Sequence, residues 1–318
     1  MLMSANPRPT SIADLPPQLA DHPANKAQER ARYFNTGNAF NVKLPDVPNA
    51  VFVDEPVRAL DAATATGFIN CDASNVMACD FAATSPLLLA RYARIRAGEQ
   101  LKCECNASGV VHYVITGSGT TDVAGERIEW NAGDVFVAPG GVLIEHTAGA
   151  EDSVLWVVGN EPQVNFENLR APAAGGAPTD LVHYTAAEID RQIELIYNVG
   201  RDEQIAGSAL IFSSDRQQAS RNVLPTLTLA MNSLPAGAVQ RPHRHNSVAV
   251  SLVIRGEKCF SKIDGVRKDW APWATTITPP VSVHSHHNEG DEQAMFLIVQ
   301  DGGLFYHARA MGFEFIDD

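Results

Sequence analysis

Histidines gather near one end of the sequence in a spacing that suits metal binding. Half of the chain's 10 histidines fall within one stretch of 45 residues, namely His243, His245, His284, His286 and His287. Four of them form the pairs "HRH" and "HSH". Because alternate residues of a β-strand share a face, each pair presents two imidazoles on one side. Neutral imidazoles bind Fe, Zn, Cu or Ni, so these pairs are a candidate metal site.

The composition limits the kind of protein that carries this site. With 318 residues, 45% of them hydrophobic and 19% charged, the chain is long enough for two folded domains. The formal charge of −13 argues against a nucleic acid or an anionic membrane as partner and favours a small molecule. The opening "MLMSANPRPTSIADLPPQ" lacks the apolar core of a signal peptide, and no apolar run has membrane-spanning length. We therefore expect a cytoplasmic protein.

The cysteines do not indicate a disulfide framework. Their number is odd, and none is in a CxxC arrangement; they are Cys71, Cys79, Cys103, Cys105 and Cys259. Cys103 and Cys105 share strand parity. We expect most of these cysteines to be inert thiols in a reducing compartment.

The texture of the sequence divides the chain into four parts. A proline-rich start gives way to short β-rich runs such as "HYVITGSG" and "DVFVAP", separated by turn residues. The linker "RAPAAGGAPTDL" and the helical pattern "TAAEIDRQIELIYNV" separate two such β-rich regions. The predicted parts are an N-terminal arm and packing segment (1–80), a first β domain (81–169), a linker with a short helix (170–206) and a second β domain (207–318).

An internal repeat relates the two β regions. Glycines, an arginine, a tryptophan and a proline recur in the same order in both copies. The spacing between the copies is one residue longer for the last four matched pairs than for the first two. The matched pairs are Gly98 and Gly237, Gly117 and Gly256, Gly125 and Gly265, Arg127 and Arg267, Trp130 and Trp270, and Pro139 and Pro279. Turn residues at these positions predict a duplicated, all-β fold of small antiparallel barrels or jelly rolls.

The stretches "GAVQRPHRH" and "PPVSVH" resemble the two sequence motifs of cupins, and the duplication resembles a bicupin. The resemblance implies two double-stranded β-helix (jelly-roll) barrels, a mostly irregular N-terminal arm and a short linking helix. It also implies that His243, His245 and His284 bind the metal. The position where cupins carry a glutamate ligand holds Ala249, which cannot bind a metal.

Aligned by the repeat, the first copy lacks these ligands. The corresponding positions hold Glu104, Asn106, Val110 and Ile144. Because an isoleucine has no lone pair to donate, we expect the first barrel to be structural, with a degenerate metal site. His112 and His146 remain in it, and His146 is the counterpart of His286. We expect both to be hydrogen-bonded barrel histidines.

Three neutral ligands leave a bound metal with its full positive charge and open positions, which suits an anionic phenolate together with O2. His286 lies two residues beyond His284, on the same face of the strand. It would reach the cavity without binding the metal, as a hydrogen-bonding partner of the substrate or as a general base. We therefore predict that His286 is catalytic.

The stretches "HRHNSVAV" and "TPPVSVHSHHNEG" resemble the gentisate 1,2-dioxygenase family, which includes salicylate and 1-hydroxy-2-naphthoate dioxygenases. The resemblance implies one Fe(II) per chain, here in the second barrel, and O2-dependent opening of an aromatic ring beside its carboxylate. It matches His243, His245 and His284 to iron ligands, and His286 to a histidine that contacts the ring hydroxyl. It also favours a homo-oligomer, with a tetramer the favoured state.

Two positions depart from that family. Ser251 stands where the family carries an arginine that holds the substrate carboxylate, and Asn232 stands where it carries a glutamine. We expect both residues to contact the substrate. Guanidinium groups could replace the missing clamp, because they bind carboxylates at two points. The candidates are Arg216, Arg221, Arg241 and Arg255.

These observations lead to one main hypothesis and two alternatives. The main hypothesis is an Fe(II)-dependent, extradiol-type dioxygenase that cleaves the ring of a hydroxylated aromatic acid, gentisate-like or salicylate-like and possibly substituted. The first alternative is a non-redox metallo-cupin, an isomerase or hydrolase, in which the metal is a Lewis acid. The second is a bicupin that binds a ligand without turnover.

Overall fold

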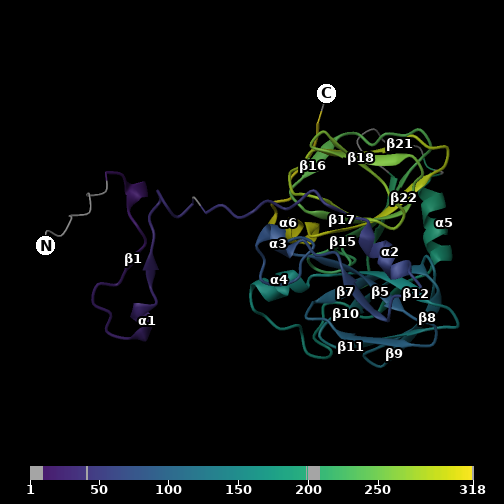
Figure 1. The fold of residues 1–318 in the computed structure, drawn as a ribbon, viewed down its shortest axis with the longest axis horizontal. Coiled ribbons are helices and arrows are strands. Elements are labelled where there is room, and N and C mark those ends of the chain that lie inside the picture. Colours follow the sequence, from purple (N-terminus) through teal and green to yellow (C-terminus); the bar gives the residue numbers. More distant parts are fainter. Residues whose placement is uncertain (1–9, 41, 198, 200–207, 317–318) are drawn as a thin grey trace. The chain divides into compact units, whose positions relative to one another are not determined.

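The computed structural model describes residues 10–40, 42–197, 199 and 208–316. The chain forms two compact units, of which one ends at Pro45 and the other begins at Asp46. The first unit contains η1 (Ile12–Asp14), a hairpin of β1 (Gln18–Leu19) with β2 (Arg32–Tyr33), and α1 (Lys26–Glu29). The second unit contains both β barrels (Figure 1).

Two antiparallel sheets form the first barrel. The six-stranded sheet has the order β13 (Val182–Tyr184), β10 (Val135–Pro139), β7 (Gly109–Thr116), β12 (Ser153–Gly159), β5 (Leu89–Ile95) and β4 (Gly67–Asn70). The four-stranded sheet has the order β6 (Gln100–Glu104), β11 (Leu143–Ala148), β8 (Ser118–Val123) and β9 (Glu126–Asn131). The non-sequential strand order is that of a jelly roll.

The second barrel repeats this arrangement. Its six-stranded sheet has the order β14 (Ser208–Phe212), β15 (Thr228–Leu234), β22 (Ala294–Gln300), β17 (Ala249–Arg255), β20 (Thr275–Thr278) and β3 (Val51–Phe52). Its five-stranded sheet has the order β19 (Val266–Asp269), β18 (Cys259–Ile263), β21 (His284–Asn288), β16 (His243–His245) and β23 (Phe313–Phe315). The two barrels confirm the predicted all-β fold.

Short helices join the strands of the second unit. They are α2 (Asp54–Leu60), α3 (Ser74–Met77), α4 (Glu161–Phe166), α5 (Ala186–Tyr197) and α6 (Gly302–Ala308). The helix α5 lies within the stretch expected to link the barrels. In the part of the chain that the structure describes, no helix has both the length and the apolar character needed to cross a membrane.

Matching hairpins show the internal repeat in three dimensions. Ala124 and Gly125 connect β8 to β9 with φ angles of 53° and 86°, and Asp264 and Gly265 connect β18 to β19 with φ angles of 48° and 77°. Positive φ at both central residues is typical of a two-residue type I′ turn, whose twist suits paired strands. The same turn therefore closes the same hairpin in both barrels.

The two six-stranded sheets share one hydrophobic core. Tyr92, Trp156, Leu252 and Ile277 all belong to it and are 0% exposed. At its centre, Trp156 Nε1 donates to Thr275 Oγ1 at 2.9 Å, and Tyr92 Oη lies 2.8 Å from the same oxygen. A polar group buried in this core is thus satisfied across the barrel interface.

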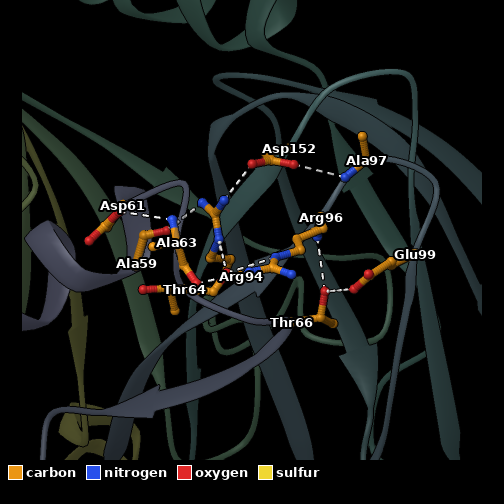
Figure 2. A network of polar contacts seen from close by, with 10 residues as sticks. All are labelled: Ala59, Asp61, Ala63, Thr64, Thr66, Arg94, Arg96, Ala97, Glu99 and Asp152. Carbon is orange, nitrogen blue, oxygen red and sulfur yellow. Dashed lines mark hydrogen bonds and ion pairs between the residues drawn. The ribbon is translucent and has the colours of Figure 1, made fainter.

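Residues before the first barrel are held to it by a buried arginine (Figure 2). Arg94 of β5 is 2% exposed; its Nε donates to the Thr64 carbonyl and its Nη1 to the Ala59 carbonyl, both at 2.9 Å. It also pairs with Asp152, whose other carboxylate oxygen accepts from the Ala97 amide at 2.9 Å. This network attaches the segment around α2 to the barrel.

Segments outside the predicted barrel ranges extend the sheets. The strand β4 pairs with β5 of the first barrel, and β3 pairs with β20 of the second. The predicted boundary between residues 206 and 207 lies outside the described residues. The boundaries after residues 80 and 169 remain predictions.

Candidate metal centre

Two neighbouring strands bring the three predicted ligands together. His243 of β16 pairs directly with His284 of β21. Along β16 the side chains alternate, so that His243 and His245 are 5% and 8% exposed while Arg244 lies on the outer face and pairs with Glu314. His284 is 4% exposed. The period of two residues in a strand therefore places three imidazoles in one buried cluster.

The positions and tautomers of the three imidazoles suit the binding of a cation. Their donor atoms all lie within 4.8 Å of one another. Each Nδ1 contacts a backbone carbonyl of a residue two positions away: Arg241 for His243 at 2.9 Å, Ser247 for His245 at 2.9 Å and Ser282 for His284 at 3.0 Å. Because a carbonyl only accepts, each Nδ1 carries the proton and each Nε2 keeps its lone pair. The donor set thus fits a metal ion.

The protonation of these histidines agrees with that role. Burial, together with the smaller effect of neighbouring imidazoles, lowers the pKa of His245 to about 4 and that of His284 to about 2. Burial also lowers the pKa of His243. All three rings are therefore neutral at physiological pH, which is the form that binds metals.

Gln300 was missed by the sequence analysis. Its side-chain amide donates to the Nε2 atom of His245 at 3.1 Å. Gln300 ends β22 and pairs in register with Ala249, the residue at the fourth-ligand position. No local sequence pattern indicates this contact, because Gln300 reaches the site through strand pairing with Ala249, which lies 51 residues earlier in the chain.

A second hydrogen-bonded group orients His286. Trp270 Nε1 donates to Ser261 Oγ at 2.9 Å, and Ser261 Oγ lies 2.8 Å from Nδ1 of His286. Because Trp270 already donates to this hydroxyl, we infer that the hydroxyl donates its own hydrogen to Nδ1 of His286. In that tautomer His286 carries its proton on Nε2 and can donate a hydrogen bond there.

A cavity of about 430 Å³ opens in front of the three histidines, a size that suits a single aromatic ligand. Polar lining residues include Asn232, Gln240, Ser251, Thr278 and Gln300, and His286 also faces the cavity. Among the described residues that line it, none is Lys, Arg, Asp or Glu. The walls therefore offer neutral hydrogen-bonding groups rather than a charged clamp.

The structure separates the predicted substrate residues into two groups. Asn232 and Ser251 line the cavity, whereas the four candidate arginines are not among its lining residues. Arg216 pairs with Asp180 at 2.8 Å and donates to the Ala177 carbonyl.

The other three arginines lie in different settings. Arg221 is an exposed turn residue with a φ of 57°. Arg241 stacks over the Phe315 ring at 4.3 Å. Arg255 donates to Gln293 at the far end of β17, six residues from Ala249, which corresponds to about 20 Å of strand.

The C-terminal segment closes one side of the cavity. Tyr306 of α6, Met311 and Phe313 of β23 contribute side chains to the lining. The Phe313 ring lies 5.3 Å from the His243 ring, because β23 pairs with β16. Sequence reasoning missed these residues, since no motif connects the chain's end to the histidine pairs.

The sheet register corrects the alignment of the first barrel. In the second barrel His284 pairs with His243, and in the first barrel its counterpart Ile144 pairs with Cys103 rather than Glu104. The structural counterparts of His243 and His245 are therefore Cys103 and Cys105.

A local difference in chain length caused the error. Three residue steps separate Gln100 from Cys103, whereas four separate the corresponding Val239 from His243. The extra residue lies next to Pro242, which cannot donate to a strand ladder. A constant offset between the two copies could not detect this insertion.

Comparison with known proteins agrees with the fold. Residues 231–300 match the family model described as the cupin domain. A salicylate 1,2-dioxygenase structure from Pseudoaminobacter salicylatoxidans, titled as an adduct with gentisate, superposes with a TM-score of 0.72 at 13% identity, covering 88% of both chains. The fold is a bicupin.

Sequence similarity covers shorter segments of the bicupin. The chain is 31% identical over 129 residues to a 5-aminosalicylate 1,2-dioxygenase of Comamonas sp. and 33% identical over 90 residues to a 1-hydroxy-2-naphthoate 1,2-dioxygenase of Nocardioides sp. (strain KP7). These segments cover 39% and 28% of this chain, but only 34% and 23% of the two relatives. The predicted resemblance to this group of proteins is confirmed.

Proposed function

We propose that this bicupin is an Fe(II)-dependent, extradiol-type dioxygenase that cleaves the ring of a hydroxylated aromatic acid of the gentisate or salicylate kind. The observation that carries the proposal is the set of three buried imidazoles that line a cavity of about 430 Å³, with donor atoms within 4.8 Å of one another. The similar proteins named above, which are dioxygenases of such acids, support it.

Charge balance favours an anionic substrate. Three neutral imidazoles contribute no negative charge, and the described lining residues contribute none. Bound Fe(II) would supply the positive charge that binds both the substrate's oxygen atoms and O2. Asn232, Gln240 and Ser251 line the cavity and would hydrogen-bond the substrate's other polar groups. The apolar side chains of Ile298 and Phe313 would contact its ring.

His286 is the proposed catalytic residue of this chain. Through its Nε2–H it would donate a hydrogen bond to an oxygen of the substrate and fix its orientation. The reaction adds both atoms of O2 to the substrate as one carbon–carbon bond breaks, so it requires no separate reductant. We further propose that the protein is cytoplasmic and forms a homo-oligomer, a tetramer in the favoured case.

The test is oxygen uptake by protein loaded anaerobically with Fe(II), using a panel of phenolic acids and substituted analogues. The expected result is uptake of one O2 per substrate, with both oxygen atoms of ¹⁸O2 found in an open-chain product. Full activity with Zn²⁺ would instead support a non-redox isomerase or hydrolase. Tight binding of the panel without turnover would support a binding protein.

Neighbouring histidines provide a matched pair of variants. His286→Ala should lower kcat by about 10²- to 10⁴-fold, the range for loss of an acid–base group, while the iron content is unchanged. His287 faces away and stacks on Phe260 with ring centroids 4.5 Å apart, so His287→Ala should leave kcat near wild type. Equal effects of the two substitutions would contradict the proposed role of His286.

A further inference from the structure

The first barrel contains a cluster of thiols and imidazoles where the second has its three histidines. Cys103 and Cys105 take the places of His243 and His245, as the strand register shows. His146 pairs with Thr121 just as His286 pairs with Ser261. The barrel has thus lost its imidazole ligands but has two sulfur atoms in their places.

The two sulfur atoms have the separation that a shared metal ion requires. The Cys105 thiol lies 3.8 Å from Cys103 Sγ. Two ligands on a tetrahedral zinc ion with bonds of about 2.3 Å are about 3.8 Å apart. Cys105 is 3% exposed, and Arg91 donates to its sulfur at 3.7 Å while pairing with Glu161. The Cys105 thiol is therefore buried beside a guanidinium whose charge is already balanced.

Two imidazoles in the same barrel have nitrogen atoms without hydrogen-bond partners. His112 and His146 are both 0% exposed, and their ring centroids are 5.1 Å apart. Thr121 contacts Nδ1 of His146 at 2.8 Å, but Nε2 of His146 and both ring nitrogens of His112 are buried and unsatisfied. Buried polar atoms are nearly always paired, so orphans of this kind call for a bound ion or water.

The charge of two sulfur ligands suits a metal cation. A thiolate rather than a thiol is the form that binds metals. Two thiolates would also neutralise a divalent cation, which reduces the cost of burying it.

We propose that the first barrel binds a thiophilic d¹⁰ metal ion, Zn²⁺ or Cu⁺, through Cys103, Cys105 and Nε2 of His146, with His112 as the fourth donor. This site is separate from the three-histidine centre and does not depend on the proposed function. Among the described residues, the three-histidine group gathers its donors within 4.8 Å, and this second group does not. Binding would therefore require the side chains of His146 and His112 to turn toward the two sulfur atoms, and a closed set of four protein ligands would make the site structural.

The two sites should prefer different metal ions, because their ligands differ. Sulfur ligands favour Zn²⁺ and Cu⁺, whereas three imidazoles with open positions also accept Fe(II). The first test is titration of the reduced, metal-free full-length protein with Co²⁺, as an optical probe for zinc, and then with Zn²⁺ or, anaerobically, Cu⁺. The expected result is two metal ions per chain and an intense thiolate-to-cobalt charge-transfer band that Zn²⁺ removes.

Variants assign the band to the barrel. Cys103→Ser with Cys105→Ser should abolish the band and leave one metal ion per chain, whereas His243→Ala with His284→Ala should keep the band. Cys259→Ser, which removes a buried thiol of the second barrel, is the control and should change neither. Absence of the band in wild type, or a band that persists in the double serine variant, would overturn the proposal.

A second measurement avoids dependence on the folding of the variants. In wild-type protein, Zn²⁺ or Cu⁺ should slow alkylation of Cys103 and Cys105 by at least 10-fold, while the rate for Cys79 is unchanged. Competition between the two ions then shows which one the site prefers. Equal alkylation with and without metal, or a Cys103–Cys105 disulfide in protein purified without oxidant, would refute a metal site.

Discussion

Ser261→Ala removes the one oxygen atom that joins Trp270 to His286. The two hydrogen bonds of this hydroxyl measure 2.9 Å and 2.8 Å, and Ser261 is 4% exposed, so water does not readily replace it. The substitution leaves the Trp270 N–H and His286 Nδ1 without partners. Each stranded buried group costs about 1–3 kcal/mol in the free energy of unfolding.

The effect on catalysis follows from the tautomer. Without the hydroxyl, the proton of His286 is free to move to Nδ1, and the donor at Nε2 is lost from part of the population. We expect kcat to fall by about 10- to 100-fold, less than for removal of an acid–base group, because the ring is still present. The KM and the bound iron should change little, since Ser261 contacts no proposed ligand.

The internal repeat supplies a matched control. In the first barrel Trp130 Nε1 donates to Thr121 Oγ1 at 2.9 Å, which lies 2.8 Å from Nδ1 of His146. Thr121→Val should therefore cost a similar free energy of unfolding, measured by urea denaturation, but leave kcat of oxygen uptake unchanged. Ser261→Thr should restore both stability and kcat in part.

Two results would refute this reasoning. One is wild-type kcat in Ser261→Ala despite a loss of stability, which would show that the tautomer of His286 does not matter. The other is an equal fall in kcat in Thr121→Val, which would show that the loss reflects general destabilisation. Either result would leave the metal ligands themselves untouched.

Three further predictions follow from particular contacts. Ala249→Glu places a carboxylate at the fourth-ligand position opposite Gln300, so it should tighten metal binding and lower kcat at least 10-fold. The control Ala249→Gln should retain activity. Equal kcat values in the two variants would argue against a side chain at this position reaching the metal. Below pH about 6.5, a histidine in the unfolded chain takes up a proton, whereas buried His284, whose folded pKa is about 2, does not. The free energy of unfolding of the metal-free protein should therefore fall by about 1.4 kcal/mol per pH unit for each such histidine as the pH is lowered. In His284→Asn the slope between pH 6 and 4, measured by urea denaturation, should be smaller by that amount. Arg94→Leu should destabilise the protein by about 1–3 kcal/mol in urea denaturation, because it removes the hydrogen bonds to the Ala59 and Thr64 carbonyls and the ion pair with Asp152. A loss below about 1 kcal/mol would show that α2 is held by other contacts.

The sequence alone predicted the fold class and the three histidines of the candidate metal centre, through strand alternation, the internal repeat and the resemblance to cupins. Alternation within a strand placed His243 and His245 on one face, and turn residues such as Gly125 and Gly265 showed the duplication. These signals need no knowledge of which strands become neighbours. The resemblance to the gentisate 1,2-dioxygenase family marked Ser251 and Asn232 as residues expected to contact the substrate, and both line the cavity.

The tertiary structure decided what depends on pairing between distant strands. Gln300 reaches His245 only because β22 lies beside β17, and the ring tautomers follow from carbonyl groups whose directions the sequence does not specify. The one-residue insertion beside Pro242 changed the register and so replaced Glu104 with Cys103 as the counterpart of His243. A shift of one residue reverses the face of every side chain in a strand, so only the folded sheet could show that thiols point into the first barrel.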